Sequence, residues 1–199
     1  MNLLLAILLS VTLWTDSLLF DAYQREDMSI WKEYVDSVTY HQSPVTNRTL
    51  LYEYGLCGYL VDRDKSNALP YVRNFKSHVE QAHSLPYREG MGVGLPAGHY
   101  EMYMSAVYVF ELRLHESVHP IQAMNLAKEA VRLAPEDPLV LAYYATCLFY
   151  APKPFGSKKE ALSYFEKARP FFQTTEYRFC WMRDATDMYI RQCRDKLKR

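Results

Sequence analysis

The chain has 199 residues and balanced charge, with 23 lysines and arginines against 23 aspartates and glutamates. A net charge of zero argues against the basic surface that nucleic-acid-binding proteins present, so no nucleic-acid partner is expected. The hydrophobic fraction of 49% is that of a globular protein, and the length allows one domain or a short repeat array. Glycine is scarce, which favours helices over a β fold with many turns.

The N-terminal segment is apolar over residues 3–14. A run of about a dozen residues is nearer to a signal-peptide core than to the roughly 20 residues of a membrane span. Thr15 and Ser17 supply the small side chains that a cleavage site requires. We therefore predict a signal peptide over residues 1–17, one domain over 18–199, and a periplasmic or secreted location. No Lys or Arg precedes the apolar run, so an uncleaved membrane anchor or a buried first helix is the alternative.

The remaining chain has helical apolar spacing almost throughout. Trp31, Tyr34, Val35 and Val38, for example, fall at i, i+3, i+4 and i+7 of one helical face. The expected helices cover about residues 21–40, 46–61, 67–83, 99–114, 120–133, 138–150, 157–171 and 175–197. The irregular stretch 84–98 either wraps the surface or borders a site. No run alternates as a strand does, so the predicted fold is all-α, in antiparallel helix pairs.

Two segments of the second half share one spacing of small and large residues. Ala123, Ala127, Ala130 and Pro135 form the first copy, Ala161, Phe165 and Ala168 the second, and Leu141, Tyr144, Ala145 and Leu148 lie between them. Small residues at such positions let helices approach closely, while the larger ones fill the gaps between helix pairs.

This spacing over residues 123–172 resembles the tetratricopeptide repeat (TPR) family. The turn Tyr-Ala-Pro-Lys-Pro-Phe-Gly-Ser and the following Glu-Ala-Leu-Ser-Tyr-Phe-Glu-Lys-Ala are similar to a subgroup of exported bacterial repeat proteins, some of them associated with transport. The resemblance implies a right-handed superhelical array of helix pairs. It also implies a non-catalytic binding or scaffold module without a cofactor, whose partner is a protein, a peptide or a small apolar ligand. Such a fold does not define a chemistry by itself.

In TPR-like arrays the first helix of each pair lines a concave groove. The corresponding positions here are Tyr52, Tyr59, Tyr108, Leu112, His115, Thr146, Phe149 and Tyr150. An aromatic, mildly polar groove suits a peptide or an apolar small molecule. The alternative is that these aromatic side chains simply pack between helices.

The segment 115–119 reads His-Glu-Ser-Val-His, which matches the H-E-x-x-H pattern of zinc hydrolases. On a continuous helix, His115 and His119 would bind zinc and Glu116 would activate water. Pro120 directly after His119 disfavours helical geometry at that histidine, and no third ligand is evident. A zinc-dependent hydrolase is therefore the alternative function, and no metal is expected in the leading one. A third possibility is a structural subunit whose final helix docks on a larger partner.

Overall fold

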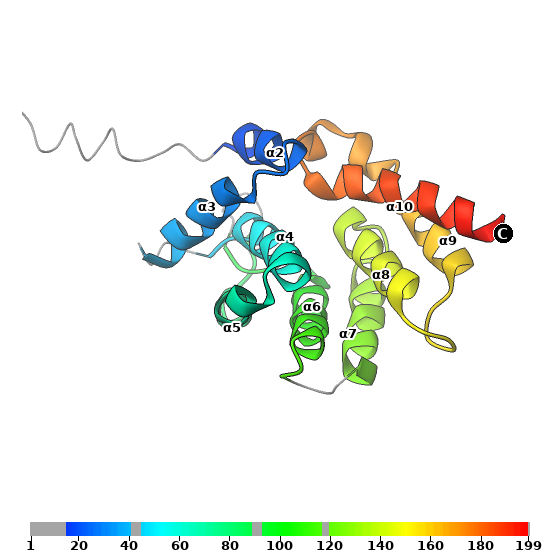
Figure 1. The fold of residues 1–199 in the computed structure, drawn as a ribbon, viewed down its shortest axis with the longest axis horizontal. Helices are drawn as coiled ribbons and strands as arrows, with labels where there is room; N and C mark the ends of the chain where they lie inside the picture. Colours follow the sequence, from blue (N-terminus) through cyan, green and yellow to red (C-terminus); the bar gives the residue numbers. More distant parts are fainter. Residues whose placement is uncertain (1–14, 41–44, 89–92, 117–119, 199) are drawn as a thin grey trace, which may run out of the picture.

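The computed structural model describes residues 15–40, 45–88, 93–116 and 120–198, and helices form all of the regular structure there (Figure 1). The α-helices are α2 (Asp16–Gln24), α3 (Met28–Tyr40), α4 (Asn47–Arg63), α5 (Lys65–His83), α6 (His99–Arg113), α7 (Pro120–Leu133), α8 (Pro138–Tyr150), α9 (Lys158–Ala168) and α10 (Trp181–Leu197). Two short 3-10 helices, η1 (Phe171–Gln173) and η2 (Thr175–Tyr177), precede α10. The all-α prediction is confirmed. Within the described residues, none of the helices combines the length and the apolar character needed to cross a membrane.

Local capping explains where several helices begin. The Thr46 hydroxyl accepts a hydrogen bond from the backbone N–H of Thr49 at 3.1 Å and caps α4. Asp137 Oδ1 accepts from the backbone N–H groups two and three residues further on, at 2.9 and 3.0 Å, and caps α8. Pro120 and Pro138 open α7 and α8, as predicted, because the first helical residue needs no N–H donor.

The single helix expected over residues 21–40 is wrong, because two helices, α2 and α3, form there. The chain turns at Glu26, whose left-handed φ of 57° ends the first helix. Asp27 then accepts a hydrogen bond from the backbone N–H of Ser29 at the start of the second. The indole of Trp31 donates to the carbonyl of Leu19 at 2.7 Å and holds the two helices together.

The helices from α4 onward form two layers (Figure 1). Helices α4, α6, α8 and α10 contact one another in succession and form the inner layer. Helices α5, α7 and α9 lie outside, and each packs against the inner helix before it. The alanines and the phenylalanine that carry the repeat spacing are all buried on α7 and α9 (Ala123, Ala127, Ala130, Ala161, Phe165 and Ala168). Small side chains at these contacts allow close helix packing.

The last helix returns to the first ones and closes the inner layer. Trp181 at the start of α10 packs against the rings of Trp31 and Tyr54, with ring centroids 5.9 and 5.6 Å apart. Its indole N–H donates to the carbonyl of Leu51 on α4 at 3.4 Å. Gly55 lies beneath the two tryptophans, and a Cβ there would come within 2.5 Å of Trp31 and 3.1 Å of Trp181. The contact between the two ends of the domain therefore requires glycine at this position.

The predicted signal peptide covers 1–17, of which residues 1–14 lie outside the described residues. Thr15 caps α2, and Asp16 accepts hydrogen bonds from Arg48 at 2.5 Å and Tyr52 at 3.1 Å. Cleavage after Ser17 would remove this cap and these contacts. Cleavage itself stays a prediction.

We predict that Gly55→Ala destabilises the protein by about 1–3 kcal/mol, because the added methyl group overpacks the tryptophan contact. Gly58→Ala is the matched control on the same helix, since its Cβ would meet only the Phe110 ring at 3.8 Å. That change should stabilise by about 0.5–1 kcal/mol, because alanine is the better helix former. Urea denaturation measures both. Equal stability of the two variants would contradict the packing described here.

Candidate ligand-binding groove

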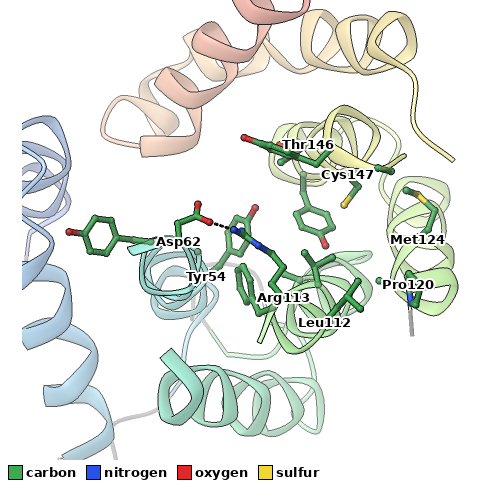
Figure 2. Close-up of a pocket in the computed structure, with 18 of the residues that line it drawn as sticks. Tyr54, Asp62, Leu112, Arg113, Pro120, Met124, Thr146 and Cys147 are labelled. Carbon is green, nitrogen blue, oxygen red and sulfur yellow. Dashed lines mark hydrogen bonds and ion pairs between the residues drawn. The ribbon is translucent and has the colours of Figure 1, made fainter. Parts of the chain in front are cut away.

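A cavity of about 610 Å³ opens on the inner face of the inner layer (Figure 2). Most of its lining is apolar or aromatic. The lining residues, which together we call the groove, are Tyr54, Gly55, Gly58, Tyr59, Asp62, Ala106, Val109, Phe110, Leu112, Arg113, Pro120, Ala123, Met124, Tyr143, Thr146, Cys147, Tyr150, Ala151, Pro152, Trp181 and Tyr189. In Figure 2, Met124 and Pro120 of α7 lie on the opposite side of the groove from Asp62. The volume is within the range of about 300–1,000 Å³ that small-molecule sites occupy.

Helix periodicity determines which α4 residues face the groove. Tyr54, Gly58 and Asp62 are four residues apart and share one face of α4. Tyr52 and Glu53 lie on the other faces of the helix, where both are buried. One helix thus contributes both to the core and to the groove.

Gly58 keeps the floor of the groove open. A Cβ at this position would meet only the ring of Phe110, at the ordinary contact distance of 3.8 Å. Glycine inside a helix costs roughly 0.5–1 kcal/mol relative to alanine. Packing does not require glycine at position 58, in contrast to position 55. Gly58 therefore keeps space open in the groove and lowers the stability of the helix.

An ion pair links two walls of the groove. Arg113 at the end of α6 donates to Asp62 near the end of α4 (Figure 2). Both side chains are about half exposed, 43% for Arg113 and 54% for Asp62. An exposed pair of this kind contributes little to stability, typically about 0.2–1 kcal/mol. The two charges neutralise each other, so the groove itself carries no net charge.

Two tyrosine hydroxyls meet where α8 and α10 approach each other. The Tyr150 and Tyr189 hydroxyl oxygens are 3.1 Å apart and share a hydrogen bond. Burial raises the pKa of Tyr189, and the hydrogen bond with Tyr150 raises it further. The Tyr189 hydroxyl therefore stays protonated at neutral pH and can orient a ligand by hydrogen bonding.

Cys147 also lines the groove and is a free thiol. Burial raises its pKa to about 11, although hydrogen bonds with Tyr143 and Ser105 act in the opposite direction. A thiol that is neutral at physiological pH is a weak nucleophile. The groove residues thus suit recognition of an apolar molecule better than covalent chemistry.

Four of the eight side chains predicted from the sequence line the groove: Tyr59, Leu112, Thr146 and Tyr150. Two others, Tyr52 and Phe149, are buried in the core and are 3% and 2% exposed. Tyr108 lies outside the groove, where it accepts a hydrogen bond from Gln122 at 3.4 Å. His115 follows the end of α6 and is not among the lining residues.

The sequence prediction missed Tyr54, Arg113, Trp181 and Tyr189. Trp181 and Tyr189 belong to α10, which one hypothesis treated as a docking helix for a larger partner. This helix packs against α8 and α9 through one buried face, and docking of its exposed face on a partner stays a prediction. The spacing of eight residues between these two aromatic side chains, like that between Tyr54 and Asp62, is the signal that could have found them.

The H-E-x-x-H segment does not lie on a continuous helix. Helix α6 ends at Arg113, and His115 has a left-handed φ of 62°. Residues 117–119 lie outside the described part, so His119 is not placed. Arg73 donates to the Glu116 carboxylate at 3.4 Å. Within the described ranges, no three His, Cys, Asp or Glu side chains gather as metal ligands would.

Two histidine–carboxylate pairs lie outside the groove. Glu53 Oε1 and His78 Nδ1 are 2.6 Å apart between α4 and α5, while the other Glu53 oxygen is buried without a hydrogen-bond partner. Burial raises the pKa of Glu53 despite the opposing effect of His78, and the hydrogen bond with Glu53 raises the pKa of His78. His99 contacts Asp137 at 3.0 Å and ties α6 to the cap of α8. Both pairs join helices, and none of their four residues lines the groove.

Comparison with known proteins identified no relative. No protein-family model matches the chain, and neither the curated proteins nor the solved structures searched contain a significant match.

We predict that the free energy of unfolding falls as pH rises above about 6.5, the pKa of an unfolded histidine, and through the raised pKa of His78 in the folded protein. A histidine with a raised pKa stabilises the folded state fully below its unfolded pKa of about 6.5 and loses this contribution as pH rises through the folded pKa. The raised pKa of Glu53 acts in the same direction at lower pH. Glu53→Gln should flatten the decline, because His78 loses its partner.

Urea denaturation at several pH values measures this effect. Glu80→Gln on α5 removes an exposed carboxylate and is the matched control, which should decline as the wild type does. An unchanged decline in Glu53→Gln would show that the buried pair is not its cause.

Proposed function

We propose that this protein is a non-catalytic binding module and that the groove binds a small apolar ligand. The observation that carries the proposal is the cavity of about 610 Å³, walled by aromatic side chains from four inner helices. Binding sites for small molecules are typically concave and apolar, with a few polar groups that set the orientation. Asp62, Arg113, Tyr150 and Tyr189 would serve that purpose here.

The alternation of inner and outer helices supports a TPR-like assignment. In such an array the first helix of each pair lines the concave face, and α4, α6, α8 and α10 have this position in the inner layer. Burial of the repeat alanines on α7 and α9 agrees with the same assignment. We extend the proposal to a TPR-like superhelix in an exported protein, for which the apolar N-terminal segment is the supporting feature.

The size of the cavity favours a small molecule over a protein partner. A stable protein interface buries about 800 Å² on each partner and includes charged or polar groups at its rim. The groove is instead a compact cavity, and its one ion pair, between Asp62 and Arg113, has no net charge. Burial of an aromatic ligand against these rings would supply most of the binding free energy.

The test uses N-phenylnaphthylamine, an uncharged dye that fluoresces in apolar sites. We predict saturable binding to the wild type and a weakening of about tenfold or more in Gly58→Leu, whose side chain occupies the groove. Tyr150→Ala should also weaken binding, because Tyr150 lines the groove and is 66% exposed. The unfolding midpoint of each variant controls for folding.

Tyr108→Ala is the matched control, because this tyrosine lies outside the groove. It should leave the affinity for the dye unchanged. If Gly58→Leu and Tyr150→Ala bind the dye as well as the wild type does, the groove is not the binding site.

A further inference from the structure

A second cavity, of about 240 Å³, lies where η1, η2 and the first turn of α10 meet. None of its lining residues lines the groove; they are Phe172, Gln173, Thr174, Thr175, Arg178 and Arg183. Phe172 is buried and is the one apolar member of this set. Every other lining side chain carries an N–H or O–H donor, and none of them is a carboxylate. The second cavity therefore presents donors and positive charge to a ligand.

Neighbouring groups hold the guanidinium of Arg183 in place. Its Nε donates to Asp184 Oδ1 at 3.0 Å, and its Nη1 donates to the backbone carbonyl of Arg178 at 2.9 Å. Its Cζ lies over the ring of Phe20, 5.4 Å from the ring centroid. These contacts use only part of the donors of the planar guanidinium, so the remaining N–H groups are oriented before a ligand binds.

Positive charge exceeds negative charge at the second cavity. Among the residues that the structure describes, Arg178 forms no ion pair, and its guanidinium lies over the ring of Phe179 at 5.2 Å. Asp184 accepts from Gln24 as well as from Arg183, so donors already occupy both of its carboxylate oxygens. Glu176, the acidic residue of η2, does not line the cavity. An anion is therefore the ligand that this charge distribution favours.

We propose that the second cavity binds a phosphate group, with Arg178 and Arg183 pairing with its oxygens. Guanidinium groups bind phosphate through paired N–H···O hydrogen bonds, which are stronger than bonds between neutral groups. The Thr174 hydroxyl already donates to the carbonyl of Phe171 at 3.1 Å, whereas the Thr175 hydroxyl has no partner within the described ranges and donates to the ligand. Two sources share this chemistry: free inorganic phosphate and the phosphate of a small organic ester. The site is independent of the function proposed for the groove.

The test is an NMR titration of the isotope-labelled full chain with sodium phosphate at constant ionic strength. The backbone amide resonances of Thr174 and Thr175 should shift in a saturable manner, with a Kd on the order of 1 mM. Arg178→Gln and Arg183→Gln should each weaken binding by about threefold or more, because each removes a charged donor. Arg191→Gln, an exposed residue of α10 that does not line the cavity, is the matched control and should leave the Kd unchanged.

The unfolding midpoint of each variant controls for folding, and Arg178→Gln is decisive if Arg183→Gln proves unstable, because Arg178 is exposed. A parallel titration with glycerol phosphate separates the two sources. A lower Kd than that of inorganic phosphate supports the ester, and an equal or higher Kd supports the free anion. The second cavity is not a phosphate site if neither compound gives a saturable shift, if sodium chloride gives the same shifts at equal ionic strength, or if Arg178→Gln binds as the control does.

Discussion

The contact between Trp181 and Trp31 across Gly55 holds the two ends of the domain together. The hydrogen bond from Trp181 to Leu51 joins residues that are 130 positions apart in the sequence. Loop closure over such a distance has an entropic cost, which burial of three large rings, with Tyr54 as the third, offsets. Besides its packing on α8 and α9, α10 also contacts α2, where Gln24 donates to Asp184 and Phe20 lies against Arg183, and these contacts support the same closure.

The groove is a consequence of this closure combined with small side chains on the inner helices. The rings of Tyr54 and Trp181 form the end at which α10 meets α4, while Gly58 leaves the floor open. Polar groups lie near helix ends, where Asp62 and Arg113 have room to pair without being buried. The rigid helices thus position an apolar surface, and the exposed ion pair contributes little to folding.

Local signals made much of the fold predictable from the sequence. Pro120 marked the start of a helix because proline lacks the N–H that interior helical positions need. The turn at Glu26 could not be predicted, because the sequence around this left-handed residue contains neither glycine nor proline. In the candidate site, Tyr150 was found from the repeat spacing, whereas Tyr52 proved to be buried in the core, because a small rotation about the helix axis changes the face. Trp181 joins the groove through a contact that only the tertiary structure creates.

Methyl NMR of the methionines tests whether the four inner helices form a ligand-binding groove. Met124 lines the groove, whereas Met102, Met104 and Met182 are buried elsewhere in the core. Titration with N-phenylnaphthylamine should shift the Met124 methyl resonance in a saturable manner and leave the other three nearly unchanged. Saturable binding of the dye without a shift of Met124 would show that the dye binds elsewhere and that the groove is not the binding site.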